Sequence, residues 1–532
     1  MGELSKLAKY LNQHISGNVF DRASICAEYS TDRSIIEATP RFVAFPETTE
    51  DVRRLVLFSD QLALRDFRLP LTMRGTGIDK TGAAISNGMI ISTERMNQIE
   101  EVDLRGRLIR VQPGITLGVL NAALSLQGLC LPIDYDPRST VGGLIANCPN
   151  DDASERHGGI FQYVERAEVV LANGEIVQFA PYHSRNVMAK IESGSPEGEL
   201  YRRIERILDQ YGDTIVNRSM RPFDSAGYAN ITRIKHGNYL SLLPLLFASQ
   251  GTLGLVTDII LRVEVVRPLM RRLATIIHDQ KTLLRFLEEV NELSPYALKL
   301  YDLKILDIAA LYGNWPELIR HDNGDGWLVI VSFNDRRYRT ERKLQRCREL
   351  INPNEALVIE TPDNSNSFQE FYSALLSFLN DGLDGERTPV MDDVYIPHYK
   401  LEDYFSGLKT LEMTLDLDLP VFGSYATSNY NVRPEIDCSS MDGRRQIVTF
   451  LRHYSRLVQD CDGSLTGGGP EGRVKTLSVA QSFTEDEREL YNAIKDAFDP
   501  NHIFNPDVKM GAELKNTIRH LRTSRRRGIA TP

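Results

Sequence analysis

A change in secondary-structure pattern near Arg267 constrains the fold of this chain more than any other feature. Before it, short apolar runs typical of strands alternate with helical runs and are separated by glycine-rich turns. After it, the runs are longer and recur in two strand–helix–strand halves. Because 532 residues are too many for one hydrophobic core, the change predicts a boundary between two folded parts. We expect an α+β protein whose second part is an antiparallel sheet with helices on one face.

The expected elements follow from apolar periodicity and from capping residues. In the first part we expect strands at 43–46, 71–74, 89–93, 108–112 and 167–171, and helices at 49–60 and 117–126. In the second part we expect strands at 273–278, 327–333, 394–397 and 420–431, and helices at 281–293, 339–350, 401–415 and 444–459. A final helix at 485–498 leads to Ile503 and Phe504, whose apolar side chains must dock on the folded body.

Charge and composition argue against several classes of protein. The net charge of −10 disfavours nucleic acid as a partner, because duplex binding depends on Lys and Arg neutralising phosphates. No run approaches the roughly 18 apolar residues of a membrane span, and residues 1–13 lack the layout of a signal peptide. We therefore expect a cytoplasmic chain with no transmembrane segment. The six cysteines are scattered without a CxxC pair, so buried or incidental thiols are expected.

Two glycine-containing segments carry the first chemical signal. Arg74-Gly75-Thr76-Gly77 directly follows a predicted strand, and Gly82 comes soon after. Glycines at such a point let consecutive N–H groups face one concavity, which can hold a phosphate; the alternative is a plain glycine turn. A Rossmann loop is disfavoured, because its third glycine would fall at Lys80.

The second segment is Ser139 to Asn147, an apolar run of small residues with paired glycines. Such residues allow a flat ligand to approach the backbone, while Ser139 and Thr140 can donate hydrogen bonds. The following run, 164–174, is typical of a strand closed by a hairpin turn.

In this order the motifs resemble those of the FAD-linked oxidases of the vanillyl-alcohol oxidase and glycolate oxidase type. The segments that carry the resemblance are 42–46, 74–77, 113–114, 140–143, 168–174, 227–228, 249–257 and 499–506. The resemblance implies a PCMH-type FAD-binding domain of two α/β subdomains and a ferredoxin-like cap domain with an antiparallel sheet. It places the FAD-binding domain at 1–265, the substrate or cap domain at 266–477 and a returning segment at 478–515. Residues 516–532 are expected to form a basic, disordered tail.

The resemblance also implies a set of FAD-binding residues. Those expected around the pyrophosphate are Arg74, Gly75, Thr76, Gly77, Ile78, Asp79 and Gly82. Those expected along the flavin and ribityl chain are Ser139, Thr140, Gly142, Gly143, Asn147 and Val164, with Asn505 beside the isoalloxazine. No histidine lies between Arg74 and Arg95, and Asp136 stands where cysteine-linked relatives attach their flavin. Non-covalent FAD is therefore expected. His157 replaces a common tyrosine, and a packed loop histidine is expected there more than a catalytic one.

The metal site of the glycolate, D-lactate and D-2-hydroxyglutarate branch is not matched. In that branch a strand with the pattern GHxGDGNxH carries two histidines, and this chain has Ser424 and Asn431 at those positions. The branch also has a GEHG turn, in which this chain has Gly468 and Gly469 in place of Glu and His. Serine, asparagine and glycine do not replace imidazole and carboxylate as ligands of a divalent metal, so no metal is predicted.

Other polar residues of the second part are candidates for catalysis. A period of two along the 420–431 strand places Tyr425 and Asn429 on one side, together with Thr427 and Asn431, and Arg433 extends the row. Glu471 is expected to alternate with Arg473 and Lys475 after the glycine turn. A phenol or carboxylate could take a hydroxyl proton, and an arginine could hold an anionic substrate. The alternative for each residue is a solvated sheet edge. Arg387 is a further candidate for binding an anion, with a surface charge as its alternative.

The expected function is an FAD-dependent oxidoreductase that moves a hydride from a hydroxyl-bearing carbon of a small polar metabolite, similar to a 2-hydroxy acid, to flavin N5. The electron acceptor stays open between oxygen, a quinone and a partner subunit. A sugar, alditol or lactone oxidase of the same fold is one alternative, since it needs no metal. A catalytically silent flavin-binding subunit is another.

Overall fold

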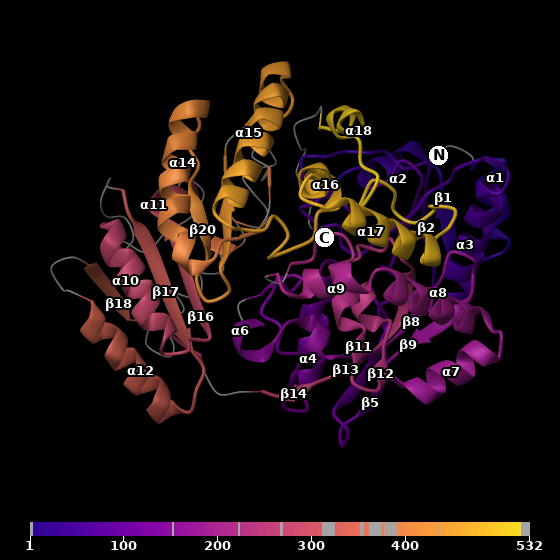
Figure 1. Ribbon diagram of the computed structural model, residues 1–532, viewed down its shortest axis with the longest axis horizontal. Coiled ribbons are helices and arrows are strands. Elements are labelled where there is room, and N and C mark those ends of the chain that lie inside the picture. Colours follow the sequence, from indigo (N-terminus) through magenta and orange to yellow (C-terminus); the bar gives the residue numbers. More distant parts are fainter. Residues whose placement is uncertain are drawn as a thin grey trace. The chain divides into compact units, whose positions relative to one another are not determined.

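The structure is a computed structural model in which the chain forms two compact units (Figure 1). It describes residues 4–151, 154–221, 224–266, 270–310, 325–351, 356–360, 375–376, 379, 390–391, 393–434 and 436–522. Unit 1 comprises Met1–Pro149, Ile160–Val265 and Leu465–Leu521, and unit 2 comprises Asn150–Gly159, Val266–Ser464 and Arg522–Pro532, in each case as far as residues are described.

The first sheet of unit 1 has the order β1-β2-β4-β3 and is mainly parallel. Its strands are β1 (Asn18–Phe20), β2 (Phe42–Phe45), β3 (Leu71–Arg74) and β4 (Met89–Ser92). Strand β4 pairs in parallel with both β2 and β3. Helix α3 (Thr49–Ala63) is the crossover from β2 to β3, and residues 75–88 connect β3 to β4. Thr48 caps α3, since its side chain accepts a hydrogen bond from the Asp51 N–H.

The second sheet of unit 1 is antiparallel, with the order β5-β6-β13-β8-β9. Its strands are β5 (Ile99–Asp103), β6 (Leu108–Val111), β8 (Val164–Val170), β9 (Ile176–Phe179) and β13 (Leu255–Arg262). Shorter strands pair as β10-β12-β11 and β7-β14, formed by β7 (Leu129–Cys130), β10 (Tyr182–His183), β11 (Lys235–His236), β12 (Tyr239–Leu240) and β14 (Glu264–Val265). Strands β8 and β9 form the hairpin that the sequence predicts at 164–174.

Helices cover these two sheets from many points of the chain. They are α1 (Lys6–Asn12), α2 (Ala23–Glu28), α4 (Leu117–Ser125), α5 (Val141–Asn147), α7 (Ser184–Glu192), α8 (Pro196–Gln210), α9 (Gly212–Ser219), α16 (Gly472–Ala480), α17 (Glu485–Phe498) and α18 (Leu514–Arg519). Single 3₁₀ turns lie at Ile160–Gln162, Ala229–Arg233 and Leu243–Leu246. Helix α17 begins with a capping box between Thr484 and Glu487.

The segment after α17 docks on the first sheet, as the sequence predicts. The Ile503 carbonyl accepts a hydrogen bond from the Leu71 N–H at 2.8 Å, and the Asn505 N–H donates to the Leu71 carbonyl at 2.9 Å. Ile503 and Phe504 are buried in the core below β3 and β4. The return of the chain to unit 1 thus adds backbone bonds and apolar packing to the strand that precedes the glycine loop.

Unit 2 is built on one antiparallel sheet of order β18-β15-β17-β16-β20-β21-β19. Its elements are α6 (Ser154–His157), β15 (Arg271–Ile277), α10 (Gln280–Asn291), β16 (Ala297–Asp302), α11 (Leu303–Ala310), β17 (Trp327–Phe333), α12 (Arg337–Leu350), β18 (Ala356–Glu360), β19 (Val394–Tyr395), the 3₁₀ turn His398–Lys400, α14 (Leu401–Leu415), β20 (Val421–Ser424), β21 (Asn429–Val432) and α15 (Met441–Asp460). The order β15, α10, β16, β17, α12, β18 is that of a ferredoxin-like βαββαβ motif.

The two faces of this sheet are covered differently. Helix α10 contacts β15 and β16, α12 contacts β17, and α14 packs its Tyr404 and Phe405 against Tyr430 and Trp327. The opposite face carries Ala274, Ile276, Leu328 and Ile330, which pack with residues of α11 and with Leu375 and Leu379. The α+β prediction is therefore confirmed, with the difference that α11 covers the face opposite to the other helices.

Three expectations about the chain differ from the structure. The predicted strand at 420–431 is a hairpin, in which β20 and β21 pair antiparallel with Ser424 opposite Asn429. The return to unit 1 begins at Leu465 and not at 478. The expected tail at 516–532 is folded in its first part, because 516–519 belong to α18 and Leu521 pairs with Ile36. The remainder of that tail, 523–532, and Arg387 lie outside the described residues.

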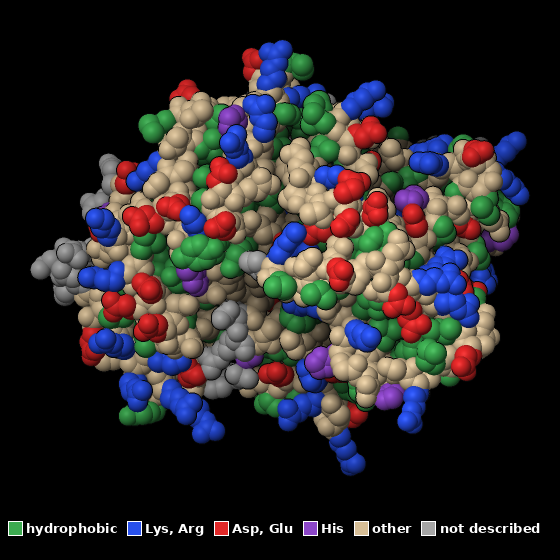
Figure 2. Space-filling model, in the orientation of Figure 1, with side chains coloured by type: hydrophobic (Ala, Val, Ile, Leu, Met, Phe, Trp, Pro, Cys, Tyr) green, Lys and Arg blue, Asp and Glu red, His purple; other side chains and the backbone are tan. Residues whose placement is uncertain are grey.

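The surface carries both signs of charge. On the face drawn in Figure 2, acidic and basic side chains are interspersed. In the described part of the chain, no helix is both long and apolar enough to cross a membrane.

Candidate functional site

The glycine loop that follows β3 is shaped by close contacts. A Cβ atom on Gly75 would lie 2.3 Å from Thr140 Oγ1, and one on Gly77 would lie 2.1 Å from an Arg74 guanidinium nitrogen. Gly77 and Gly82 also have φ angles of +73° and +79°, which favour glycine. The loop therefore requires glycine both for its left-handed backbone and for its approach to the following segment.

Arg74 lies beneath this loop and supports it from inside. Its guanidinium donates to the carbonyls of Ala84 at 3.2 Å and Tyr29 at 3.4 Å and lies over the Tyr29 ring. Burial lowers the pKa of Arg74, an effect opposed by Asp32 and other nearby acidic groups. The Arg74 side chain thus has internal partners, and its contribution to the site is the position of the loop.

Asp79 closes the loop from within. Its carboxylate accepts hydrogen bonds from the Thr81 N–H at 3.0 Å and the Ala83 N–H at 2.8 Å, and from the Thr81 hydroxyl. Burial, assisted by the neighbouring Asp32, raises the pKa of Asp79 to about 7. This carboxylate therefore faces the backbone of its own loop. Ile78, beside it, is half-buried.

Helix α5 presents a face of small residues. Thr140 caps the helix by accepting a hydrogen bond from the Gly143 N–H at 3.1 Å. Val141, Leu144 and Ile145 are buried on one side, whereas the half-buried side consists of Gly142, Gly143, Ala146 and Asn147. A Cβ on Gly142 would lie 2.8 Å from Pro113 Cβ, so this glycine is needed for packing, while Gly143 meets only its own cap.

Ser139 and Val164 have mainly structural contacts. The Ser139 N–H donates to the Asp136 carbonyl at 2.9 Å and its own carbonyl accepts from Leu117. Val164 begins β8, is buried and pairs with Leu261 of β13. Both residues position α5 and β8, and neither was distinguishable from a ligand contact by sequence.

Asp136 occupies the position at which related flavoproteins carry a linking cysteine. Its carboxylate pairs with the Arg138 guanidinium at 3.0 and 2.8 Å and with Arg33 at 3.5 Å. Although burial raises the pKa of Asp136, hydrogen bonds from Arg138 outweigh it and the net pKa is lowered. Thr76, at the tip of the glycine loop, donates its hydroxyl proton to the Arg138 carbonyl at 2.9 Å, so the loop and this ion pair are joined.

Gln250 connects three segments of unit 1, a role that the sequence did not predict. Its amide nitrogen donates to Asn147 Oδ1 at 3.0 Å and Thr81 Oγ1 at 2.9 Å, and its amide oxygen accepts from the Gly472 N–H at 2.8 Å. Gln250 itself adopts a φ of +53°. The fold, and no local sequence pattern, brings residues this far apart in sequence to one point.

Asn505 is held by four hydrogen bonds within unit 1. Its amide nitrogen donates to the carbonyls of Ala83 and Gln250, at 2.9 and 2.8 Å. Its amide oxygen accepts from the Thr72 hydroxyl at 3.0 Å and the Arg473 guanidinium at 2.8 Å. Since all four positions of the amide are occupied, Asn505 fixes the loop after β3, and its predicted reach to the isoalloxazine would require these bonds to change.

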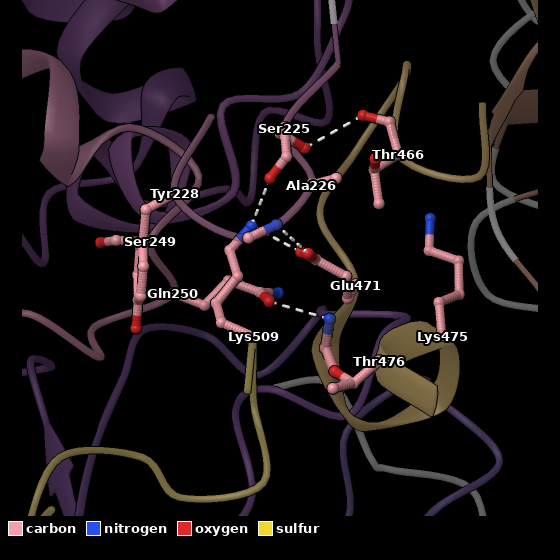
Figure 3. A network of polar contacts seen from close by, with 12 residues as sticks. Ser225, Ala226, Tyr228, Ser249, Gln250, Thr466, Glu471, Lys475, Thr476 and Lys509 are labelled. Carbon is pink, nitrogen blue, oxygen red and sulfur yellow. Dashed lines mark hydrogen bonds and ion pairs between the residues drawn. The ribbon is translucent and has the colours of Figure 1, made fainter. Parts of the chain in front are cut away.

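The expected alternation of Glu471, Arg473 and Lys475 is replaced by a helix. Glu471 is the N-cap of α16, and its buried carboxylate accepts from the Gly227 N–H and forms an ion pair with Lys509 (Figure 3). The Lys509 ammonium also donates to the Ser225 carbonyl at 2.6 Å. Burial lowers the pKa of Lys509, while Glu471 opposes that change. The predicted catalytic role of Glu471 therefore gives way to a structural one.

Lys475 holds the glycine turn that precedes α16. Its ammonium donates to the carbonyls of Leu465 at 2.7 Å and Gly469 at 3.3 Å. In Figure 3 this side chain lies apart from the Glu471–Lys509 pair. Arg473 donates to the Gly82 carbonyl at 2.6 Å and so ties α16 to the glycine loop.

In unit 2, the hairpin separates residues that a continuous strand would have aligned. Tyr425 lies in the turn, its ring stacked on His398 with centroids 4.0 Å apart, and burial followed by the charge of Glu288 raises its pKa. Asn429 stays in β21 opposite Ser424, and its amide nitrogen donates to Thr427 Oγ1 at 3.3 Å. The Tyr425 N–H donates to the Leu298 carbonyl at 2.8 Å, so Tyr425 follows Ser424 along β16 and lies on the other face from Ser424 and Asn429. The predicted row of Tyr425 with Asn429 is therefore wrong.

Asn431 and Arg433 continue the Asn429 side of β21. The Asn431 amide donates to Asp393 Oδ1 at 2.5 Å and accepts from the Asp393 N–H at 2.8 Å. Arg433 is buried and donates to the Leu379 carbonyl at 3.2 Å. His157 belongs to α6 and lies near the Tyr296 ring, a packed position.

The residues at the positions expected to hold a metal do not fit one. Ser424 offers a neutral hydroxyl, the Asn431 amide is occupied by Asp393, and Gly468 and Gly469 have no side chains. Within the described ranges, no group of three His, Cys, Asp or Glu side chains could hold a metal ion.

The chemistry of two adjoining segments of unit 1 suits a dinucleotide with a flat ring, and its binding there stays a prediction. The left-handed glycine loop and the small-residue face of α5 leave backbone without Cβ atoms in adjoining segments, joined by the contact of Gly75 with Thr140. These segments contain the residues that the sequence predicts from the loop and from α5. Arg138 and Gln250, which help to hold the two segments in place, were missed. Arg473 was expected only beside Glu471, and its bond to the Gly82 carbonyl was not foreseen.

Two family models match the sequence. One, described as an FAD binding domain, matches residues 40–180, and the other, described as the C-terminal domain of FAD linked oxidases, matches residues 278–508. Related sequences include the D-2-hydroxyglutarate dehydrogenase of Haemophilus influenzae, 24% identical over 93% of this chain and 50% of the relative. The glycolate oxidase subunit GlcD of Bacillus subtilis is 22% identical over 91% of this chain and 93% of the relative. The D-lactate dehydrogenase of Anaerostipes hadrus is 23% identical over 88% and 89%.

The chain spans half the length of the D-2-hydroxyglutarate dehydrogenase it matches. Among solved structures, p-cresol methylhydroxylase with substrate bound superposes with a TM-score of 0.68 at 14% identity, covering 96% of this chain and 98% of that one. An alkyldihydroxyacetonephosphate synthase gives a TM-score of 0.62 at 15% identity, covering 92% and 82%. These likenesses confirm the predicted PCMH-type fold.

Proposed function

The chain belongs to the FAD-linked oxidase family, and from that premise we propose that it oxidises a hydroxyl-bearing carbon of a small polar metabolite. FAD is its cofactor, as both matched domains indicate. When bound, FAD supplies the two-electron redox chemistry, and the protein supplies binding and orientation. The single observation that carries the proposal is the combination in unit 1 of an intact glycine loop with the open face of α5.

The binding of FAD is assigned to two groups of residues. The backbone N–H groups of the loop Gly75–Gly77 are proposed to hold the pyrophosphate, with Arg74, Ile78, Asp79 and Gly82 keeping the loop in shape. The face of α5 with Gly142, Gly143 and Asn147 is proposed to lie against the flavin and its ribityl chain. The two surfaces are proposed to be held in position by the backbone and side-chain contacts of Ser139, Thr140, Val164 and Asn505.

We propose that the FAD is bound without a covalent link. Asp136 stands at the cysteine position and is engaged by Arg138 and Arg33, and a carboxylate forms no stable bond to a flavin methyl group. Acid precipitation of the purified protein is expected to release the yellow colour into the supernatant. Flavin that stays on the denatured pellet would contradict this assignment.

The leading substrate class is a 2-hydroxy acid, as the names of the related dehydrogenases suggest. In unit 2, Asn429 and Arg433 lie on one side of β21 and are the proposed substrate contacts, an amide and a cation suited to a hydroxyl and a carboxylate. Tyr425 is proposed to stay protonated at neutral pH, because burial raises its pKa, and so to serve packing and not proton abstraction.

A second candidate is the oxidation of a sugar, an alditol or a lactone. The observation that favours it is the neutral chemistry of the hairpin, where Ser424 and Asn431 stand at the histidine positions and Thr427 stands at the aspartate position. Both candidates share the expectation that activity survives exhaustive dialysis against a chelator, because the side chains at the metal positions are poor ligands. Activity lost on dialysis and restored by zinc or manganese would contradict it.

The test of the proposed function is anaerobic reduction of the flavin. Purified holoprotein is mixed with D-lactate, glycolate, D-2-hydroxyglutarate, glycerol and xylitol, one at a time, and the visible flavin absorbance is followed. Bleaching by a hydroxy acid supports the leading candidate, and bleaching by polyols alone supports the second. Full absorbance with every compound would sink both and favour a silent flavin-binding subunit.

The electron acceptor and the cellular compartment are proposed only as classes. The acceptor is one of oxygen, a quinone or a partner subunit, to be separated by following reoxidation of the reduced flavin with each. We propose action in the cytoplasm, since all six cysteines are free, as expected for a reducing compartment. Localisation of a tagged chain by fractionation tests this.

A further inference from the structure

Two buried polar atoms face each other across the hairpin of unit 2 without hydrogen-bond partners. Ser424 Oγ and Asn429 Oδ1 have no partner among the described residues, and their residues are 8% and 5% exposed. Ser424 and Asn429 are directly opposite in the β20–β21 ladder. Opposite residues point to the same face, with Cβ atoms about 4.5–5.5 Å apart, so one small group can reach both.

The face that carries this pair is the one opposite α10, α12 and α14. Ser424 alternates with Phe422, which is directly opposite Tyr301 of β16 and packs against the apolar cluster of that face. Lys299 of β16 is directly opposite Ser424 on its other side, so a cation adjoins the pair. Asn431, two residues beyond Asn429, is bonded to Asp393, which leaves Ser424 and Asn429 as the neutral part of this polar strip.

Buried polar atoms without hydrogen-bond partners destabilise the folded chain, so packing alone does not explain Ser424 and Asn429 at these positions. A buried hydroxyl or amide oxygen without a partner is disfavoured by its lost hydration. A ligand that supplies the missing bonds removes that cost and is favoured over an analogue that lacks them.

The missing partner has to donate a hydrogen bond to Asn429 Oδ1, and it can either donate to Ser424 Oγ or accept from it. Asn429 Oδ1 can only accept, and Ser424 Oγ can do either. A hydroxyl group satisfies both atoms, and it does so in either orientation of the Asn429 amide. A carboxylate has no proton to donate and would leave an acceptor unpaired, and a divalent metal would find only two neutral oxygens.

We infer that Ser424 and Asn429 form a subsite for a hydroxyl group of the substrate. This inference rests on the proposed function, because it names the part of the substrate that unit 2 recognises. It makes the pair a positioning element for the hydroxyl-bearing part of the molecule and predicts discrimination against analogues in which that hydroxyl is replaced by hydrogen.

The experiment measures binding without turnover. The holoprotein is reduced with dithionite beforehand, so that no substrate can be oxidised, and is titrated calorimetrically with matched pairs of compounds that differ in one hydroxyl. The pairs are D-lactate and propionate, D-2-hydroxyglutarate and glutarate, and glycerol and 1,3-propanediol. At least one hydroxylated member is expected to bind about tenfold more tightly than its partner, the effect of one or two neutral hydrogen bonds.

Variants then locate the preference. Ser424→Ala and Asn429→Ala are each expected to reduce the tenfold preference to about twofold or less, whereas Ser424→Thr, which keeps a hydroxyl, should retain most of it. Thr275→Val is the matched control. Its hydroxyl is also buried and without a partner within the described chain, but Thr275 alternates with Ala274 and Ile276 and so lies on the other face of the same sheet. This control is expected to keep the full preference.

Failure of the subsite and failure of the proposed function give different results. An unchanged preference in Ser424→Ala and Asn429→Ala, equal loss in Thr275→Val, or no preference in the wild type would each overturn the subsite, even if the flavin is reduced by members of the panel. A preference that depends on both residues, in a protein whose flavin no compound reduces, would support the subsite and overturn the oxidoreductase assignment.

Discussion

Unit 1 and unit 2 each contain a buried polar cluster, and the two are satisfied to opposite degrees. In unit 1, the Glu471 carboxylate receives the Gly227 N–H and the Lys509 ammonium, and that ammonium also reaches the Ser225 carbonyl. In unit 2, Ser424 and Asn429 face each other with atoms that have no partner among the described residues. The first cluster is charged and closed, and the second is neutral and open.

The difference teaches how to separate structural polar residues from ligand-binding ones. A buried charge that already has its partners is needed to hold segments together, and its loss harms the fold. A buried neutral group that lacks partners contributes little to the fold and keeps its bonding capacity for a ligand. Glu471 has the residue type of a catalytic base, but its contacts assign it to the first class.

The largest expected effect on stability is that of Glu471→Ala. The substitution leaves the Lys509 ammonium buried without its carboxylate, which costs about 3–5 kcal/mol. Chemical denaturation should show this loss. Glu485→Ala is the control, because it breaks an ion pair with Arg488 in which Glu485 is 72% exposed, and exposed pairs contribute only about 0–1 kcal/mol. Equal stability of the two variants would remove the distinction between the clusters.

Flavin binding provides a second test, this time of the glycine loop in unit 1. Gly77→Asp is expected to lower flavin occupancy at least about tenfold, because it places a Cβ 2.1 Å from an Arg74 guanidinium nitrogen and a negative charge beside the proposed pyrophosphate position. Gly128→Asp is the matched control: its φ is +68°, similar to +73° at Gly77, but nothing lies within 4 Å of its Cβ. Occupancy is measured as the ratio of flavin to protein absorbance. Full occupancy in Gly77→Asp would exclude the phosphate role.

A smaller effect is expected from Asp79, whose carboxylate faces its own loop with Asp32, Arg74 and Arg473 nearby. Its pKa is raised to about 7 in the folded chain, above the ordinary value of 3.8. The protonated form is therefore favoured by folding, so the stabilisation is complete below pH of about 4 and is lost as pH rises through about 7.

The measurement for Asp79 is the thermal midpoint between pH 5 and pH 8. The wild type should lose a few degrees more than Asp79→Asn over this interval, on the order expected for a chain of this size. Asparagine keeps one acceptor and does not ionise, so its profile should be flatter. Parallel profiles would show that Asp79 does not titrate in this window.

Much of the fold was predictable from the sequence, because its strands are short apolar runs between glycine turns. The strand expected at 327–333 has the bounds of β17, and the helix expected at 401–415 has those of α14. The hairpin was missed because the turn at 425–428 contains neither proline nor glycine and has β-forming residues on both sides. The nearest glycine, Gly423, lies within β20. Periodicity gives no sign of such a break.

The site was predictable where it depends on local backbone and not where it depends on distant partners. Gly75 and Gly77 are needed for the loop's own geometry, so a local motif identifies them. The pairing of Glu471 with Lys509, 38 residues apart, and the bridge of Gln250 to Asn147, 103 residues apart, are set by the fold. For the same reason Glu471 was expected at the substrate, since its residue type was visible and its partner was not.

The smallest expected effect on the free energy of unfolding is that of Ser424→Ala. It sharpens the comparison because Ser424 and Tyr404 both carry buried hydroxyls, and only the Tyr404 hydroxyl of these two has a partner among the described residues. On the other face of the same sheet, the Tyr404 hydroxyl is bonded to that of Tyr454 at 2.8 Å. Tyr404→Phe is expected to cost about 1–3 kcal/mol, since it removes that bond and leaves the Tyr454 hydroxyl unpaired. Ser424→Ala removes a hydroxyl that has no partner in the described chain, so its free energy of unfolding should stay within about 0.5 kcal/mol of the wild type, or rise. Urea unfolding of both variants, with flavin content measured in parallel, gives the comparison. A loss in Ser424→Ala as large as that in Tyr404→Phe would mean that this hydroxyl serves the fold, and the unit 2 cluster would then belong to the same class as the one in unit 1.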